Sequence, residues 1–221
     1  MSGLRSILER AQSDGVAVAH FNIADFSMLK EVFEAARELM VPVIVGASES
    51  EREFLGARQI AALVHDLQEE FGFPIFLNAD HTHSLRGAIE AANAGYDSIV
   101  FDLSALPVQE NIRQTREAID ALKRINPEIL IEGEIGDIGT GSEIHETAPD
   151  LAKGLTTPED AKHYVDSTGV DVLAFFMRYR ITYRLLMRTS HPRLICAAIA
   201  VTPSSRYRPK RGRCTSMYPR S

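Results

Sequence analysis

Short apolar runs alternate with helical stripes along the first 174 residues of the chain. The apolar runs are rich in Val, Ile, Leu and Phe, as expected for buried strands. Between them, apolar residues recur every three or four positions, which is the spacing of one helix face. The predicted strands cover residues 16–22, 41–48, 73–80, 97–104, 128–136 and, as the opening of a sixth, 170–174. The predicted helices cover residues 28–39, 60–71, 85–94, 112–125 and a segment that begins at Thr157 and Pro158.

Strands that alternate with helices predict a parallel sheet covered by helices. Two architectures have this order, the doubly wound open sheet and the TIM barrel. No Gly-x-Gly-x-x-Gly motif follows the first predicted strand, which argues against a dinucleotide-binding sheet. Five complete units and a sixth strand in 174 residues match the density of a barrel, which takes about 250 residues for eight units. We therefore predict an α/β fold, a (β/α)8 TIM barrel that is incomplete here, with about five and a half βα units.

The composition is that of an ordinary globular protein, with 45% hydrophobic residues and a net charge of −6. The apolar run 194–201 has eight residues, far fewer than the roughly 20 that a membrane span needs. Residues 1–12 are amphipathic and lack the apolar core of a signal peptide. Cys196 and Cys214 are too few for a disulfide framework or a metal cluster. We expect a soluble cytoplasmic protein with no membrane partner.

Charge is distributed very unevenly along the chain. All 30 acidic residues lie in residues 1–174, together with 13 Lys and Arg, whereas residues 175–221 hold 11 basic residues and no acid. This step falls inside the sixth predicted strand rather than in a linker, where domain boundaries normally lie. We therefore expect 1–174 to be the partial barrel, and 175–221 to be a poorly ordered, out-of-frame translation that begins near codon 175. The alternative is a genuine basic tail, in which 206–213 would bind nucleic acid.

Polar side chains end five successive predicted strands, at the rim where barrel active sites lie. They are Asn22, Ser48, Asp80 with His81, Asp102, and Glu132 with Glu134. A carboxylate beside an imidazole suits metal binding or proton transfer. Two carboxylates at positions i and i+2 share one face of a strand, and facing the barrel interior they are costly without a cation or a proton.

Several of these residues also have a purely structural interpretation. Asn22 is a common turn residue, and Ser48 is a good cap for a following helix. His83 follows His81 by two positions, but it lies beside Ser84 in what reads as the cap of the next helix, so we expect it to be a cap residue rather than a ligand.

Three motifs resemble the class II, zinc-dependent fructose-bisphosphate aldolases and their ketose-bisphosphate relatives. They are Asn-Ala-Asp-His at 78–81, Phe-Asp-Leu-Ser-Ala-Leu-Pro at 101–107 and Ile-Glu-Gly-Glu-Ile-Gly at 131–136. The stretches 19–23 and 45–49 fit as well, and the resemblance covers residues 1–174 in order. It implies a barrel that cleaves a ketose 1,6-bisphosphate to dihydroxyacetone phosphate and an aldehyde, and that runs the reverse aldol addition.

The resemblance also implies roles for single residues. Asp80 would be the acid/base at the aldehyde oxygen, and His81 would be one of three zinc-binding histidines. Asp102 and Glu134 would hold a second cation or an alternative zinc position, and Glu143, in the loop after the fifth strand, would move the carbon-bound proton. Glu132 would support a ligand rather than bind metal.

For the ligands outside the protein, the resemblance implies that Asn22 and Ser48 line the pocket of a phosphorylated sugar. It also implies a homo-oligomer that acts in glycolysis and gluconeogenesis. This sequence departs from the common family pattern at Asn78, where many members have His. It also departs in the loop after the fifth strand, where Glu143 is displaced by one position.

The resemblance stops after residue 174. The family's second and third zinc histidines, and the His-Gly-Gly-Ser-Gly-like run that binds phosphate, have no counterpart in residues 175–221. We therefore expect this chain to bind zinc weakly, to be inactive and to aggregate. The alternatives are another metal-dependent barrel, such as a hydrolase that uses His81 and His83, and the basic-tailed nucleic-acid-binding protein, although we expect no nucleic-acid partner.

Overall fold

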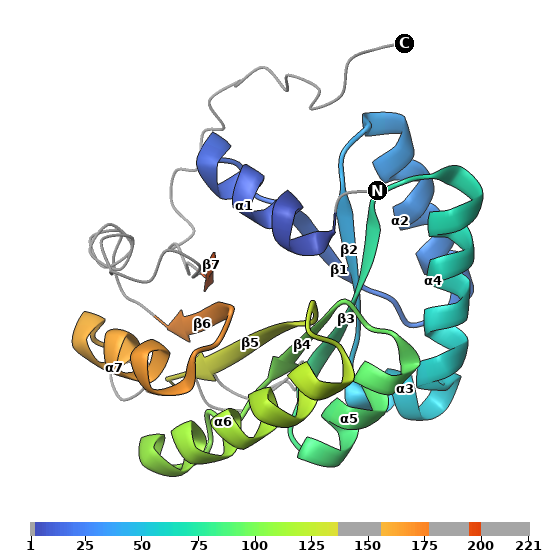
Figure 1. The fold of residues 1–221 in the computed structure, drawn as a ribbon. Helices are drawn as coiled ribbons and strands as arrows, with labels where there is room; N and C mark the ends of the chain where they lie inside the picture. The colour runs from blue at the N-terminus through green and yellow to red at the C-terminus, as the bar shows by residue number, and fades with distance from the viewer. Residues whose placement is uncertain (1–2, 137–155, 177–194, 200–221) are drawn as a thin grey trace, which may run out of the picture.

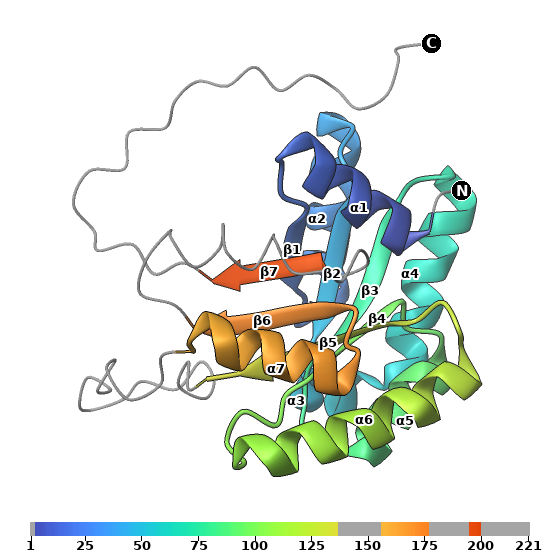
Figure 2. The ribbon, with the colours of Figure 1, turned by 60° about the vertical axis from the view of Figure 1, so that its left-hand side comes forward.

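The computed structural model describes residues 3–136, 156–176 and 195–199. Its strands form one parallel sheet in which the strand order follows the chain order from β1 to β7. The strands are β1 (Ala19–Asn22), β2 (Val43–Ala47), β3 (Ile75–Thr82), β4 (Ser98–Phe101), β5 (Leu130–Ile135), β6 (Val172–Phe176) and β7 (Ile195–Ile199). Figures 1 and 2 show the strands fanned into a curved sheet, which is an incomplete TIM barrel as predicted.

The first helix precedes β1, and the other helices of the described residues follow strands in the βα order that a barrel requires. They are α1 (Leu4–Asp14), α2 (Phe26–Leu39), α3 (Glu49–Leu55), α4 (Ala57–Phe71), α5 (Leu85–Ala94), α6 (Val108–Ile125) and α7 (Pro158–Thr168). Figure 1 shows α2 and α4 to α7 on the convex side of the sheet and α1 on its concave side. The sequence had suggested one helix between the second and third strands, and the structure has two, because Gly56 separates α3 from α4.

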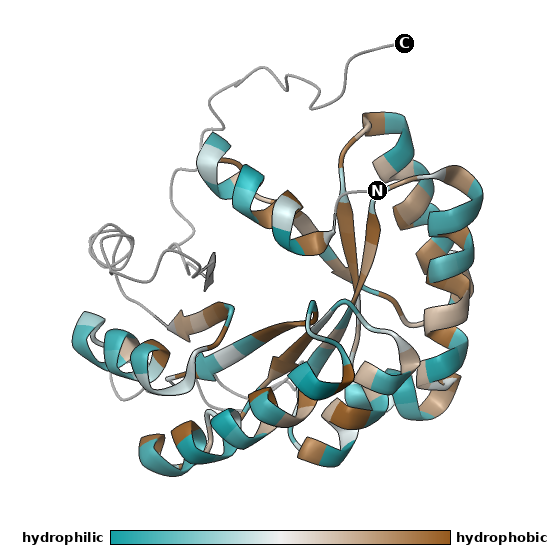
Figure 3. Cartoon of the chain, viewed as in Figure 1, coloured by the Kyte–Doolittle hydropathy of each residue, from teal (hydrophilic) through white to brown (hydrophobic). Residues whose placement is uncertain are grey.

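The main core lies between the convex face of the sheet and these helices, and Figure 3 shows hydrophobic residues along the strands. Val45, Leu77, Ile99 and Ile131 point to this side from four neighbouring strands and are fully buried. Because side chains alternate along a strand, the residues between them point to the concave side. The same alternation that buries the core therefore presents polar residues to the barrel interior.

Local capping interactions fix where the helices begin. Thr157 and Asp160 form a capping box at the start of α7, with Pro158 at the first helical position, as the sequence predicted. Ser84 caps α5 by accepting a hydrogen bond from the Gly87 amide, and Gly95 ends that helix in the left-handed conformation. These caps place the loops that carry the polar residues at one end of the sheet.

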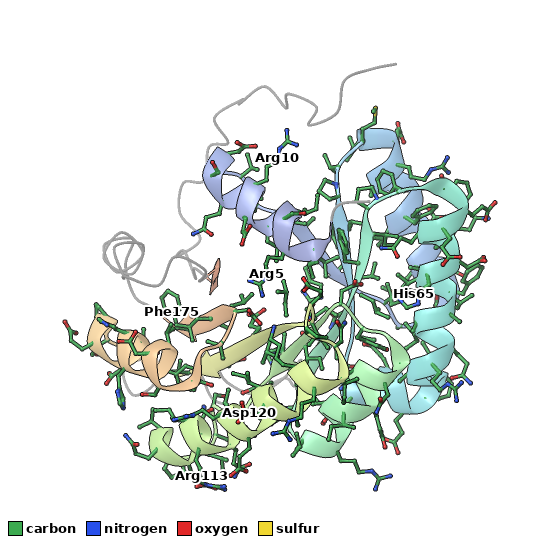
Figure 4. All side chains as sticks on the ribbon, in the orientation of Figure 1. Arg5, Arg10, His65, Arg113, Asp120 and Phe175 are labelled. Atoms are coloured by element: carbon green, nitrogen blue, oxygen red, sulfur yellow. The ribbon has the colours of Figure 1, made fainter. Side chains whose placement is uncertain are left out.

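Helix α1 packs inside the curved sheet near the amino ends of the strands. Leu4 and Ile7 pack against Phe76 and Leu130, which point inward from β3 and β5. Arg5 lies on the side of α1 that faces the strands (Figure 4), and it forms an ion pair with Asp171, just before β6. Helix α1 also contacts β7. It therefore fills the end of the interior opposite the polar rim.

The seventh strand is the main difference from the sequence prediction. Residues 195–199 pair in parallel with β6, from Val172 opposite Ile195 to Phe176 opposite Ile199. They lie in the segment that we expected to be poorly ordered. The strand coincides with the apolar run 194–201, which is too short for its periodicity to distinguish a strand from a helix.

Candidate active site

The polar residues expected at the strand ends lie at one rim of the sheet. Asn22 ends β1, Asp80 lies near the end of β3, Asp102 directly follows β4, and Glu134 lies near the end of β5. Parallel pairing aligns the carboxyl ends of these strands. The rim is therefore assembled from residues that are distant in the sequence.

A local irregularity in β3 brings His81 into the site. The pairing of β3 with β4 shifts between Ala79 and Thr82, and His81 has φ +34°, outside the usual range for a side-chain-bearing residue. His81 Nδ1 lies 2.9 Å from Asp102 Oδ2 and 3.7 Å from Glu134 Oε2. Two successive residues, Asp80 and His81, thus both contribute to the rim, which a regular strand would not allow.

The ion pair between His81 and Asp102 dominates the electrostatics of the rim. Its hydrogen bond raises the pKa of His81 to about 9, although partial burial of the ring opposes the shift. Burial opposes the ionisation of Asp102, but hydrogen bonds from His81 and Ser104 outweigh it and lower the pKa of Asp102 to about 2. The imidazole therefore sits in a strongly negative environment.

The two glutamates of β5 have raised pKa values, in contrast to the lowered pKa of Asp102. Burial raises the pKa of Glu132 to about 7, with the Asp80 carboxylate as the second cause. Burial also raises the pKa of Glu134 to about 7, with repulsion from Asp102 as the second cause. Burial therefore outweighs the attraction of His81, whose Nδ1 atom lies 3.7 Å from Glu134 Oε2, and a bound cation would favour the ionised form of both carboxyl groups.

His83 belongs to the same cluster, which the sequence analysis did not favour. Ser84 is the cap of α5, and His83 faces the rim with its Nε2 atom 3.7 Å from Asp102 Oδ2. One donor atom each from His81, His83 and Asp102 lie within 4.8 Å of one another. The spacing of two residues between His81 and His83 was the one sequence signal for a shared site. The irregularity in β3 meant that the sequence could not show which way the two rings point.

Asn22 positions Asp80. Its amide Nδ2 donates a hydrogen bond to Asp80 Oδ2 over 2.7 Å. Gly46 allows this approach, because a Cβ atom there would lie 2.3 Å from both Asn22 Oδ1 and His20 Nε2. His20 is thus a further residue of the rim that the sequence analysis did not single out.

Ser48 acts as the cap of α3. Its hydroxyl accepts a hydrogen bond from the Glu51 amide, and its own amide donates to Glu51 Oε2 over 2.6 Å. The structural interpretation of Ser48 is therefore confirmed, and its expected role in binding substrate stays a prediction. Glu143 lies outside the described residues.

Arg52 is a buried charged residue whose hydrogen bonds stabilise the backbone that carries the rim residues. Its guanidinium donates to the carbonyl oxygen of Ala47, to that of Asp80 over 3.1 Å, and to Thr82 Oγ1 over 2.9 Å. These acceptors lie at the end of β2 and on both sides of His81. Arg52 therefore ties two strand ends together and fixes the irregular segment of β3.

An incomplete parallel α/β barrel with imidazole and carboxylate groups at its carboxyl rim has the architecture of a barrel enzyme. The family model described as "Fructose-bisphosphate aldolase class-II" matches residues 2–177. The chain belongs to this family, which confirms the resemblance seen in the sequence.

Relatives in other organisms agree with this assignment. A fructose-bisphosphate aldolase of Thermus caldophilus is 30% identical over 168 residues, which are 76% of this chain and 54% of that protein. The YdjI aldolase of Escherichia coli K12 has 27% identity and a TM-score of 0.67, covering 79% of this chain and 61% of that one. The fructose-bisphosphate aldolase of Campylobacter jejuni has 27% identity and a TM-score of 0.62, covering 78% and 56%. The chain thus spans little more than half the length of these relatives.

No helix in the part of the chain that the structure describes has the length and apolar character to cross a membrane.

Proposed function

We propose that this protein is a zinc-dependent ketose-bisphosphate aldolase. It would cleave fructose 1,6-bisphosphate or a stereoisomer to dihydroxyacetone phosphate and glyceraldehyde 3-phosphate, and catalyse the reverse addition. The observation that carries the proposal is the placement of Asp80 beside His81, with Asp102 and Glu134 around the imidazole, inside the span of the family match.

The donor set fits a divalent cation. Imidazole nitrogen and carboxylate oxygen are ordinary zinc ligands, and the residues that we propose as ligands are His81, Asp102 and Glu134. When bound, zinc supplies Lewis acidity that polarises a carbonyl oxygen. Burial and repulsion from Asp102 raise the pKa of Glu134, and a bound cation would favour its ionised form.

The protein's own groups would orient the substrate and move its protons. Asp80 would exchange a proton with the hydroxyl oxygen of the aldehyde half, and the hydrogen bond from Asn22 holds its carboxylate in place. Asn22 and Ser48 would line the sugar-phosphate pocket. Glu143 would transfer the proton at the carbon atom that becomes nucleophilic.

We further propose that residues 175–221 contain an out-of-frame segment and that this 221-residue chain is itself inactive. The charge step at residue 175 and the lack of two family histidines support both proposals. Residues 195–199 nevertheless pair with β6 as strand β7, so this part of the segment is a strand whether or not it is translated out of frame. We also propose that the enzyme is cytoplasmic and homo-oligomeric and that it acts in glycolysis and gluconeogenesis.

The test begins with the DNA across codons 165–221, translated in all three frames. We expect another frame to restore a glycine-rich turn with a histidine and a His-Gly-Gly-Ser-Gly-like run. The restored protein, loaded with zinc, should then release triose phosphate from fructose 1,6-bisphosphate, whereas the 221-residue chain should not.

The Asp80→Asn variant of the restored protein should lose at least a thousandfold in kcat, and Asp120→Asn, at an exposed position of α6, should retain full activity. Absence of the expected motifs from every frame would contradict the proposal of a frameshift. Release of inorganic phosphate without triose phosphate would show that the protein is a hydrolase rather than an aldolase.

A further inference from the structure

Besides His20, the rim contains another imidazole that the proposed function does not use, that of His83. The resemblance to the family assigns one zinc histidine, His81, to the described residues. His83 is 53% exposed at its side chain, and its ring lies nearly parallel to that of His81 with centroids 6.4 Å apart. The helix cap does not need His83, because Ser84 provides it.

We propose that His83 is a metal ligand in this chain, held in position by Glu49, so that His81, His83 and Asp102 form a three-residue site for zinc. This inference rests on the proposed function, since it concerns the metal that the aldolase reaction would use. It adds a ligand and a positioning residue from the described part of the chain.

The distances between donor atoms support a shared ion. Two ligands that each lie about 2.1 Å from a tetrahedral zinc ion are about 3.4 Å apart. Asp102 Oδ2 lies 2.9 Å from His81 Nδ1 and 3.7 Å from His83 Nε2, so the observed spacings bracket this value. The 3.7 Å separation is too long for a hydrogen bond and leaves room for an ion between the two atoms.

Glu49 determines which nitrogen of His83 is available. Its carboxylate contacts His83 twice, with Oε1 3.0 Å from the backbone amide and Oε2 3.0 Å from Nδ1. An ionised carboxylate only accepts hydrogen bonds, so the proton of a neutral His83 lies on Nδ1. The lone pair is then on Nε2, the atom that faces Asp102.

This is the arrangement that orients histidine ligands in many metal sites, where a carboxylate holds the nitrogen that does not bind the metal. Glu49 is the first residue of α3, directly after the Ser48 cap, so its backbone is fixed by the same capping box that begins the helix. Two imidazoles and one carboxylate leave a fourth position for Glu134, whose Oε2 atom lies 3.7 Å from His81 Nδ1.

The test measures metal binding by the purified 221-residue chain, without an activity assay. The chain is stripped with a chelator, and its zinc affinity is measured by competition with a chromogenic chelator. The absorption spectrum with Co²⁺ reports the number and type of ligands. Circular dichroism spectra establish that each variant is folded.

We expect His83→Ala to weaken zinc binding at least tenfold and to change the Co²⁺ spectrum. Glu49→Gln should weaken zinc binding by about tenfold, in the range found for carboxylates behind histidine ligands. The matched control is His163→Ala, at a histidine of α7 whose hydrogen bonds are exposed to solvent. This control should leave the affinity unchanged within twofold.

His81→Ala separates this inference from the proposed function. If His81→Ala abolishes zinc binding while His83→Ala and Glu49→Gln bind zinc as the parent chain does, the role of His83 is refuted and the proposed function stands. If zinc binding survives in His81→Ala, the proposed metal position itself is wrong and both fail. If the parent chain binds no zinc, the three-residue site is refuted, and the proposed function is decided by the activity of the restored protein.

Discussion

Replacing Arg52 should destabilise the fold strongly, because its guanidinium is the only group that the structure shows bridging Ala47, Asp80 and Thr82 in the described residues. The side chain is buried, and burial also lowers the pKa of the guanidinium, so the three acceptors lie in a poorly hydrated place. Arg52→Met removes the donors and leaves a side chain of similar length. Water cannot easily replace the lost hydrogen bonds.

The expected loss follows from two opposing contributions. A buried hydrogen bond from a charged donor contributes about 1.5–3 kcal/mol, and three acceptors lose their partner. Removing a buried cation recovers several kcal/mol of desolvation free energy. We therefore expect Arg52→Met to lower the free energy of unfolding by about 3 kcal/mol, which is a large part of the stability of a typical domain.

Urea unfolding followed by circular dichroism measures this loss. Arg52→Lys keeps the charge but cannot present a planar fork to three acceptors, so it should lose most of the same free energy. Arg86→Met is the control, because the Arg86 side chain is 89% exposed and forms only an i,i+4 ion pair with Glu90. That variant should change stability by less than about 0.5 kcal/mol. Equal stability of Arg52→Lys and the parent chain would refute the proposed geometric role.

Two further substitutions test the positioning of the rim and the capping of α7. Gly46→Ala would place a Cβ atom 2.3 Å from Asn22 Oδ1, so Asn22 must move away from Asp80. Because the side-chain ends that clash can change rotamer, unfolding should become easier by only about 0.5–1.5 kcal/mol, and a crystal structure of the variant that retains the Asn22–Asp80 hydrogen bond would contradict this reasoning. Thr157→Ala removes the hydroxyl that accepts from the Asp160 amide over 3.1 Å and donates to its carboxylate over 2.6 Å. It should lower the stability by about 1 kcal/mol in a urea titration, and an unchanged midpoint would show that this cap contributes nothing.

The sequence predicted the sheet and the rim well because both follow from strong local patterns. Apolar strands at regular spacing predict a parallel sheet, and parallel pairing then brings Asn22, Asp80, Asp102 and Glu134 to one end without any further information. The start of α7 at Thr157 was equally predictable, because its capping interactions are all made within four residues.

The residues that were missed depend on contacts that no local pattern contains. Arg52 lies on a short helix, where an arginine normally faces solvent, and its burial arises from the ends of β2 and β3 meeting beside it. His83 was assigned to the helix cap because its neighbour Ser84 is the stronger capping residue. Its approach to Asp102 depends on the shift in pairing between Ala79 and Thr82, which the spacing of residues does not reveal.

The apolar side chains that stabilise the fold and the ionisable side chains of the site lie on opposite faces of the same strands. In β5, Ile131 faces the core and is fully buried, whereas its neighbour Glu132 faces the interior with a pKa raised to about 7. Ionising Glu132 and Glu134 at neutral pH therefore opposes folding, while the apolar face of the strand favours it. A cation bound at the rim would offset the repulsion between Glu134 and Asp102, so metal binding should stabilise the fold as well as the site. Such coupling would let one strand carry two carboxyl groups with raised pKa values and still belong to a well-packed sheet.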